Sequence, residues 1–345
     1  MRTVAIEEFL RLNSAIPAVD VRSPGEFSAG HIPNAHSIPV FTNDERAVVG
    51  TMYKQQGKKE AIEKGLELVG PKMLALAKQA EHIASEGELL VHCWRGGMRS
   101  NRMAWLFEQL GLSCVVLEGG YKAYRNHILK SFTAPMNLMV LSGPTGTGKT
   151  DVLHAMKSLG EQVLDLEGLA NHKGSAFGGL GMPAQPSSEQ FQNNIFAAMQ
   201  SLNPQKRIWV ESESLTIGRA YLPVTLWNAM NAASSVELIV PKQMRIQHLV
   251  NQYGTVDVQL LAESIKKIQQ NFGGNRVKES LELLEVGNLA SVADMLLDYY
   301  DKRYQFGRTK HAKASIVSLE SPIGDALANA KMILNHINNL NGPTY

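Results

Sequence analysis

Short apolar stretches alternate with helix-like stretches along the first 130 residues of the chain. Runs of apolar residues predict strands at 18–21, 88–92 and 113–117, and apolar residues at helical spacing predict helices over 61–84 and 100–110. This alternation is typical of a parallel sheet covered by helices. We therefore predict an α/β domain for residues 1–130.

The alternation begins again after residues 131–135, which we interpret as a short linker. Residues 171–188, rich in Gly, Pro and Ser, predict a long irregular loop, which in a compact domain is more often functional than filler. Residues from about 241 to 310 have a mostly helical pattern with a break at Gly273-Gly274. The second predicted domain, 131–345, is thus a parallel-sheet α/β domain with a helical extension. Its predicted strands are 137–141, 162–166, 207–210, 236–240 and 314–318.

Length and composition describe an ordinary globular protein. A chain of 345 residues exceeds the usual size of one hydrophobic core. No stretch of about 20 apolar residues suggests a membrane span, and the N-terminal segment lacks the apolar core of a signal peptide. Two cysteines are too few for a disulfide framework or a cysteine-based zinc site. They suit a reducing compartment, so we expect a cytoplasmic protein.

The formal net charge of +2 does not by itself indicate a nucleic-acid partner. Basic residues nevertheless gather in two segments, which could face phosphates or could be ordinary solvated surface charge. One group is Arg95, Arg99, Arg102, Lys122, Arg125 and Lys130, and the other is Lys302, Arg303, Arg308, Lys310 and Lys313.

Segment 91–100 holds the clearest candidate for covalent chemistry. A predicted strand ends at His92, Cys93 opens a short glycine-containing loop, and a predicted helix follows. Converging backbone N–H groups, the helix dipole and nearby arginines would all favour a thiolate and could bind a tetrahedral oxyanion. Cys114, inside the apolar run 114–117, is predicted to be a packing residue instead. The predicted nucleophile is Cys93, and its anion-binding loop comprises Arg95, Gly96, Gly97 and Arg99.

Residues 143–150, GPTGTGKT, fit the Walker A pattern of phosphate-binding loops. They lie between a predicted strand and a predicted helix, which is the context that this pattern requires. Glycines let backbone N–H groups converge on phosphates, lysine adds a point charge, and the threonine hydroxyl is placed to bind Mg²⁺. The predicted phosphate-binding residues are Gly143, Gly146, Gly148, Lys149 and Thr150.

Charged residues near other predicted strand ends are candidates for a second set of site residues. Asp165 lies at the end of one predicted strand, and Glu211 and Glu213 follow another strand of the same predicted sheet, where carboxylates could hold magnesium or a water. Arg219 and Arg245 are weaker candidates for a phosphate clamp. Ordinary surface charge is the alternative interpretation of all five.

Several segments of the N-terminal domain resemble rhodanese domains. They are 20–27 (DVRSPGEF), 30–35 (GHIPNA), Ile38-Pro39 and 117–121 (LEGGY), together with the Cys93 loop. The resemblance implies that Cys93 handles sulfur or selenium. Cys93 and Arg99 have the Cys-x5-Arg spacing of the related phosphatases and arsenate reductases. The longer loop leaves room for a phosphate-like group, so simple thiosulfate sulfurtransfer is less expected.

A rhodanese-like domain fused to a Walker A domain resembles the tRNA 2-selenouridine synthase family. Lys173 stands where this family more often has arginine, and lysine grips a phosphate less well than a bidentate guanidinium. The segments that carry the resemblance are 93–100 (CWRGGMRS), 143–150, 165–178 (DLEGLANHKGSAFG), 211–214 (ESES), and 217–219 (IGR) with Pro223.

The resemblance implies a transferase that acts on tRNA carrying 2-thiouridine at the wobble position. It implies conversion of this base to 2-selenouridine with selenophosphate, and transfer of a geranyl group from geranyl diphosphate to the sulfur. A functional link to a selenophosphate-producing enzyme follows, while Mg²⁺ at Thr150 and the binding of ATP stay open. Two alternatives remain. One is a rhodanese-type phosphatase or sulfurtransferase coupled to a nucleotide-binding, kinase-like domain, and the other is a non-enzymatic, nucleotide-gated adaptor.

Overall fold

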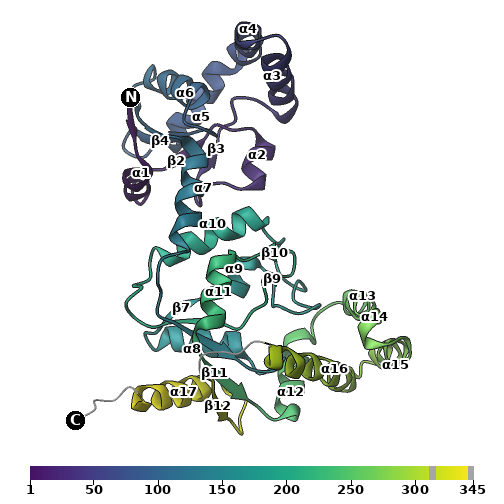
Figure 1. Ribbon diagram of the computed structural model, residues 1–345. Helices are drawn as coiled ribbons and strands as arrows, with labels where there is room; N and C mark the ends of the chain where they lie inside the picture. Colours follow the sequence, from purple (N-terminus) through teal and green to yellow (C-terminus); the bar gives the residue numbers. More distant parts are fainter. Residues whose placement is uncertain (311–315, 341–345) are drawn as a thin grey trace, which may run out of the picture. The chain divides into compact units, whose positions relative to one another are not determined.

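The computed structural model describes residues 1–310 and 316–340 and divides the chain into two compact units, Met1–Phe132 and Thr133–Tyr345. Figure 1 shows the first unit in purple to blue and the second in teal to yellow. Within the described residues, no helix is both long enough and apolar enough to cross a membrane.

The first unit is built on a five-stranded parallel sheet with the strand order β1-β5-β4-β2-β3. The strands are β1 (Arg2–Val4), β2 (Ala18–Asp20), β3 (His36–Ser37), β4 (Glu88–His92) and β5 (Ser113–Leu117). The helices are α1 (Ile6–Leu12), α2 (Pro24–Ala29), α3 (Asn43–Gln55), α4 (Lys58–Val69), α5 (Met73–Ile83), α6 (Met98–Glu108) and α7 (Gly120–Ser131), with a 3-10 turn at Gly70–Lys72.

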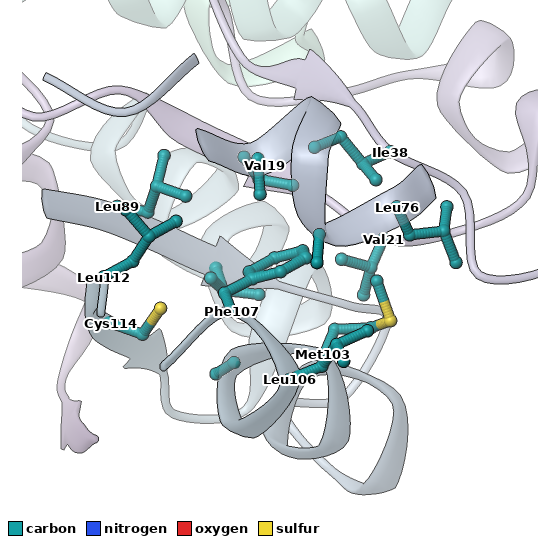
Figure 2. Packing of buried hydrophobic residues seen from close by; sticks show 14 of the residues in the cluster. Val19, Val21, Ile38, Leu76, Leu89, Met103, Leu106, Phe107, Leu112 and Cys114 are labelled. Atoms are coloured by element: carbon teal, nitrogen blue, oxygen red, sulfur yellow. The ribbon is translucent and has the colours of Figure 1, made fainter. Parts of the chain in front are cut away.

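One hydrophobic cluster joins β2, β4 and β5 to α5 and α6. Val19, Leu89 and Phe107 are fully buried in it (Figure 2). Cys114 belongs to the same cluster and is 2% exposed, which confirms that it packs in the core. Because Asp20 pairs with His92 and Val91 with Val116, the carboxyl ends of the three strands lie together at one edge of the sheet.

A buried arginine ties the rhodanese-like segments together. Arg22, whose side chain is fully buried, binds the Asp20 carboxylate through two nitrogens at 2.6–3.0 Å and donates to the Gly30 carbonyl at 2.6 Å. Its guanidinium lies 3.8 Å from the centre of the Tyr121 ring. A buried arginine of this kind must be paired and hydrogen-bonded, so segments 20–27 and 117–121 are fixed against one another.

The second unit has another five-stranded parallel sheet, with the order β12-β11-β6-β8-β7. Its strands are β6 (Leu138–Ser142), β7 (Gln162–Leu164), β8 (Ile208–Glu211), β11 (Ser234–Ile239) and β12 (Ile316–Glu320), and β9 (Thr216–Ile217) pairs with β10 (Ala220–Tyr221) in a separate hairpin. Its helices are α8 (Lys149–Ser158), α9 (Leu166–Ala170), α10 (Ser188–Met199), α11 (Val224–Ala232), α12 (Lys242–Tyr253), α13 (Val258–Lys267), α14 (Gln269–Phe272), α15 (Gly274–Glu285), α16 (Leu289–Lys310) and α17 (Ala326–Leu340).

The predicted parallel sheets and the helical extension are confirmed, with shifts of a few residues at the element ends. Helices α12 to α16 form the extension, and α14 ends at the predicted break, where Gly273 has a φ of +97°. The predicted helix over 61–84 is two helices, α4 and α5, because Pro71 interrupts it. The described part of β12 begins at Ile316. Residues 314 and 315 of the predicted strand lie outside the described residues, as does Lys313 of the second basic group.

Candidate functional site

The Cys93 loop begins where β4 ends and leads into α6. Cys93 is 3% exposed, so its sulfur lies at the floor of the loop. Cys93 Sγ is 3.2 Å from Ser100 Oγ, in the first turn of α6. Three backbone N–H groups, those of Arg95, Gly97 and Ser100, also hydrogen-bond to the sulfur. The loop therefore surrounds one sulfur atom with donors at a helix N-terminus, which is the arrangement expected for a stabilised thiolate.

The loop keeps this shape because it lies directly on the turn between β5 and α7. Gly96 has a φ of +61°, and a Cβ there would lie 2.4 Å from the Leu117 carbonyl oxygen. The N–H of Tyr121 donates to the Cys93 carbonyl at 2.8 Å, and that of Lys122 donates to the Trp94 carbonyl at 2.9 Å. Only glycine fits at position 96, for reasons of both conformation and space.

The two cysteines are equally buried but differ in electrostatic environment. Burial alone would raise the pKa of Cys93, but the hydrogen bonds from the Ser100 hydroxyl and the loop N–H groups outweigh it, so the pKa lies below that of an ordinary thiol. Burial raises the pKa of Cys114 to about 12, and the nearby Glu108 carboxylate adds to the effect. Cys93 is thus the better nucleophile near neutral pH.

The two predicted arginines of the loop have different surroundings. Arg99 Nη1 donates to Glu26 Oε2 at 2.9 Å and so joins α6 to α2. The same carboxyl group completes the N-terminal cap of α2 by accepting from Ser23 N–H. Arg95 is exposed and, among the described residues, forms no ion pair. Arg95 is therefore the loop cation that is free to meet an anion.

In the second unit, the 143–150 loop joins β6 to α8. Lys149 Nζ donates to the Gly143 carbonyl at 3.0 Å, so the lysine lies across its own loop. Helix α8 begins at Lys149, and its first N–H groups and positive dipole end are therefore at the loop. The sequence prediction of strand, glycine-rich loop and helix is confirmed here.

A cluster of carboxyl groups lies beside this loop. The Thr150 hydroxyl is 2.9 Å from Glu167 Oε2 and 3.1 Å from Glu211 Oε2, and it can donate to one of them at a time. One oxygen from each of Glu167, Glu211 and Glu213 lies within 4.8 Å of the others. Gly174 is packed against this cluster, because a Cβ there would lie within 3 Å of carboxylate oxygens of Glu167 and Glu213.

The surroundings of the three carboxyl groups raise their pKa values, so each group favours either a bound proton or a nearby cation. Burial is the main cause that raises the pKa of each, and repulsion among them raises the pKa of Glu211 and Glu213 further. The pKa of Glu213 rises to about 8, and that of Glu211 lies well above its ordinary value. The neighbouring Glu167 carboxyl group adds to the rise in the pKa of Glu213.

These residues fit a divalent cation. Glu211 is fully buried, and no hydrogen-bond donor of the described residues reaches its Oε1 atom. An orphaned, buried carboxylate oxygen is costly, and a bound Mg²⁺ would satisfy it. Magnesium prefers hard oxygen donors and is usually shared with phosphate oxygens. The hydroxyl of Thr150 and the carboxylates of Glu167, Glu211 and Glu213 would hold it.

A cavity of about 310 Å³ opens from the 143–150 loop. Its polar end is lined by Lys149, Thr150 and the three carboxyl groups, and by Lys173 and His248. Its other end is formed by apolar side chains of the helical extension. These are Leu261, Ile265, Leu284, Val292 and Leu296. The cavity can therefore hold a ligand that is anionic at one end and apolar at the other.

The structure brings some of the other predicted residues into this cavity and leaves others outside. Glu211 and Glu213 line it, as predicted for carboxylates at the strand ends. Asp165 instead caps α9 by accepting from Gly168 N–H at 2.7 Å and contacts His154 Nε2 at 2.8 Å. Arg219 is exposed in the β9–β10 hairpin and is not part of the lining. Its backbone N–H donates to the side-chain oxygen of Gln185 at 3.1 Å.

The guanidinium of Arg245 is already paired within the protein and is not free to bind a phosphate. It binds the Asp301 carboxylate through two nitrogens at 2.8 and 2.9 Å and donates to the Thr145 carbonyl at 3.1 Å. It therefore fastens the 143–150 loop to α16.

Several lining residues were not singled out as site residues from the sequence. Glu167 lies in α9 and His248 in α12, and neither was named as a site residue, whereas Lys173 had been noted only through the family resemblance. The residues of the apolar end could not be identified from the sequence, because their spacing is that of any packed helix. Glu167 alone had a usable signal, since it follows a strand of the sheet that carries the 143–150 loop.

Comparison with known proteins covers nearly the whole chain. A family model described as the tRNA 2-selenouridine synthase AAA domain matches residues 136–322, and a rhodanese-like domain model matches residues 6–127. The tRNA 2-selenouridine synthase of Bdellovibrio bacteriovorus is 34% identical and covers 84% of this chain and 88% of its own. That of a Sulfurovum species is 33% identical and covers 86% of this chain and 90% of its own. A solved rhodanese-related protein from Thermoplasma volcanium is 20% identical, with a TM-score of 0.24, over 37% of this chain and 93% of that one.

The environment of Cys93 predicts a difference in thiol reactivity. At pH 7, iodoacetamide should alkylate Cys93 and leave Cys114 unmodified, although the two residues are 3% and 2% exposed. Ser100→Ala should slow alkylation of Cys93 about tenfold, because one hydrogen bond to a charged group contributes about 1.5 kcal/mol. Peptide mass spectrometry over a range of pH gives both rates. Equal rates for the two cysteines, or no effect of the substitution, would contradict the role assigned to the loop.

The carboxyl cluster predicts a pH-dependent stability of the second unit. Glu213 has a pKa of about 8 when folded and about 4.5 when unfolded, so the folded state keeps a proton that the unfolded state releases. Its contribution to the free energy of unfolding therefore decreases as the pH rises from about 4.5 to about 8.

Glu213→Gln should then raise the unfolding temperature at pH 8 without divalent cations, by about 2–4 °C for each kcal/mol gained. Mg²⁺ should stabilise the wild-type protein more than the variant. Thermal unfolding with EDTA and with Mg²⁺ measures both effects. Glu263→Gln, an exposed site on α13, is the control. An identical response to Mg²⁺ in the wild type and Glu213→Gln would exclude Glu213 as a ligand.

Proposed function

Because the chain belongs to the tRNA 2-selenouridine synthase family, we propose that this enzyme converts wobble 2-thiouridine in tRNA to 2-selenouridine, with geranyl diphosphate and selenophosphate as co-substrates. A tRNA-modifying role follows from the family. The co-substrates and the assignment of each step to a site are our proposal.

The observation that carries the proposal is the two-ended cavity. Geranyl diphosphate has a charged diphosphate and an apolar ten-carbon chain. The 143–150 loop, Lys149 and Lys173 provide cations and N–H groups for the diphosphate. The apolar end, with residues such as Ile265 and Leu296, would hold the hydrocarbon chain. A nucleotide would place a ribose and a hydrogen-bonding base against the aliphatic side chains of this end, which offer those polar groups no partners, so this end suits a hydrocarbon chain better.

The polar end is suited to geranyl transfer. The 2-thiouridine sulfur attacks C1 of the geranyl group, the C1–O bond breaks, and its electron pair leaves with the diphosphate. The base loses its N3 proton in the same conversion. Negative charge develops on the departing diphosphate, and Lys149 with the N–H groups of α8 would stabilise it there. Magnesium, when bound, would neutralise part of the same charge.

The Cys93 loop is suited to the selenium step. Its converging N–H groups and the free cation of Arg95 match a tetrahedral anion such as selenophosphate. Geranylation makes the sulfur a better leaving group, so the Cys93 thiolate could attack C2 of the base and release the sulfur as geranyl thiol. The selenium of selenophosphate would then attack C2, the Cys93 thiolate would leave, and hydrolysis of the P–Se bond would release phosphate. N3 of the base regains its proton, and no change of oxidation state is needed. A selenophosphate-producing enzyme would supply the donor.

Substitutions in the two sites should separate the two steps. Cys93→Ser should abolish selenation and leave geranylation largely intact, whereas Lys149→Ala should lower geranylation by about a hundredfold or more, by analogy with loss of one donor to a developing anion. Mass spectrometry of nucleosides from 2-thiouridine-containing tRNA, incubated with both co-substrates, measures each product.

Lys157→Ala, at the exposed far end of α8, is the matched control. Loss of both products in Cys93→Ser would refute the division of labour. An unchanged nucleoside profile with the wild-type protein would favour the phosphatase or sulfurtransferase alternative.

The apolar end of the cavity predicts a preference between ligands. Geranyl diphosphate should bind at least about 100-fold more tightly than inorganic diphosphate, because each buried CH₂ contributes about 0.8 kcal/mol to the binding free energy. Val292→Phe should fill part of the apolar end and reduce this ratio while the affinity for diphosphate stays unchanged. Titration calorimetry measures both affinities. Val258→Phe, 48% exposed on α13, is the control. Equal affinities for the two ligands would refute the isoprenoid assignment.

A further inference from the structure

Three exposed cations on and near the Cys93 loop have no ion-pair partner among the residues that the structure describes. Several surface lysines on α4 and α5 pair with carboxylates, such as Lys64 with Glu67 and Lys78 with Glu81. Arg95, Arg102 and Lys122 are exposed, and no carboxylate of the described residues lies within ion-pair distance of them. Glu118, which is exposed and directly follows β5, is also outside ion-pair distance of these three cations. Three positive charges without a partner in the described part of the chain therefore lie on the loop and on α6 and α7, the helices that the loop leads into and packs against.

Large apolar side chains lie among these cations. Met98 and Trp105 are each 49% exposed, and together with Arg102 they follow one another at positions i, i+4 and i+7 of α6. That spacing places them in one stripe along a single helix face. Trp94, adjacent to Cys93, is 36% exposed. The hydrogen bond from Lys122 N–H to the Trp94 carbonyl fixes the start of α7 beside it.

We propose that this surface, which we name the α6 surface, binds the single-stranded anticodon loop of the tRNA substrate. It consists of Trp94, Arg95, Met98, Arg102, Trp105 and Lys122. The inference rests on the proposed function and adds to it the part of the molecule that contacts the RNA. Unpaired bases stack on aromatic side chains, and guanidinium and ammonium groups neutralise the phosphates between them. A base stacked on Trp94 would lie beside the residue that carries the reactive sulfur.

The charge pattern favours RNA over a protein partner for this surface. A protein partner would need carboxylates placed opposite each of the three cations, whereas an RNA strand presents a phosphate at every nucleotide. Spaced cations with aromatic side chains between them match that repeat, because bases and phosphates alternate along a single strand. The wobble base is itself part of a single-stranded loop, so it can leave its neighbours and reach the loop of Cys93.

The test measures binding of the full chain to an RNA stem-loop that carries 2-thiouridine at the first anticodon position. Trp94→Leu and Trp105→Ala should each weaken binding by about 5- to 100-fold, the range for loss of one base–aromatic stack. The double variant Arg95→Gln/Arg102→Gln should also reduce the slope of log affinity against log salt by about 1.4, since each phosphate contact in a single strand contributes about 0.7. Fluorescence anisotropy at several salt concentrations gives both quantities.

Two variants on another face of the same unit are matched controls. Tyr53→Ala removes a 58% exposed aromatic ring on α3, and Lys59→Gln removes a cation that pairs with Glu63. Both should bind the stem-loop as the wild type does. A thermal unfolding midpoint and a circular dichroism spectrum like those of the wild type show that each α6-surface variant is folded.

Wild-type binding that survives all three α6-surface variants would overturn this inference and leave the proposed function standing. A change of oligomeric state in Trp105→Ala, with RNA affinity unchanged, would also overturn it and assign the face to a second copy of the chain. A wild-type protein that does not bind the stem-loop would overturn both the surface and the proposed function.

Discussion

The Cys93 loop depends on a contact between two stretches of backbone. Gly96 lies so close to the Leu117 carbonyl and the Gly119–Gly120 turn that no side chain fits between them. Hydrogen bonds from the start of α7 to the carbonyls of Cys93 and Trp94 complete the contact. Because the loop is held in this way, its N–H groups point at one sulfur before any ligand arrives. The lowered pKa of Cys93 is thus a consequence of the fold. Arg22 contributes indirectly, because its guanidinium packs on the ring of Tyr121.

The second unit has the same kind of strand–loop–helix junction, but the charges around it are different. Its 143–150 loop also presents N–H groups at a helix start, but a cluster of buried carboxyl groups lies opposite. Such a cluster destabilises the fold, because burial and mutual repulsion both oppose ionisation. A local conflict of this kind is expected where a fold keeps a site for a ligand. A cation shared between the carboxylates and a diphosphate would relieve it.

Local sequence signals were enough to predict both parallel sheets, both loops and the packing role of Cys114, but not the short edge strands β1 and β3. Apolar runs mark buried parallel strands, and a glycine-rich loop between a strand and a helix is typical of an anion-binding site. Residues whose position depends on distant partners could not be predicted. Asp165 follows a strand as expected, yet its carboxylate caps α9, and Arg245 is taken up by Asp301. His248 and the apolar end of the cavity come from helices whose spacing looks like that of any packed helix.

The two sites share no residue. The Cys93 loop and all of its supports lie within Met1–Phe132, and every residue that lines the cavity lies within Thr133–Tyr345. In the proposed reaction, residues of one unit therefore geranylate the base and residues of the other replace its sulfur with selenium. A single-stranded RNA segment can present one base to two sets of residues because its nucleotides rotate about a flexible backbone, whereas a base in a duplex cannot. The division of residues also has a chemical consequence. A reactive thiolate in the lining of the cavity would be alkylated by the geranyl donor, and Cys93 is not one of the residues that line it.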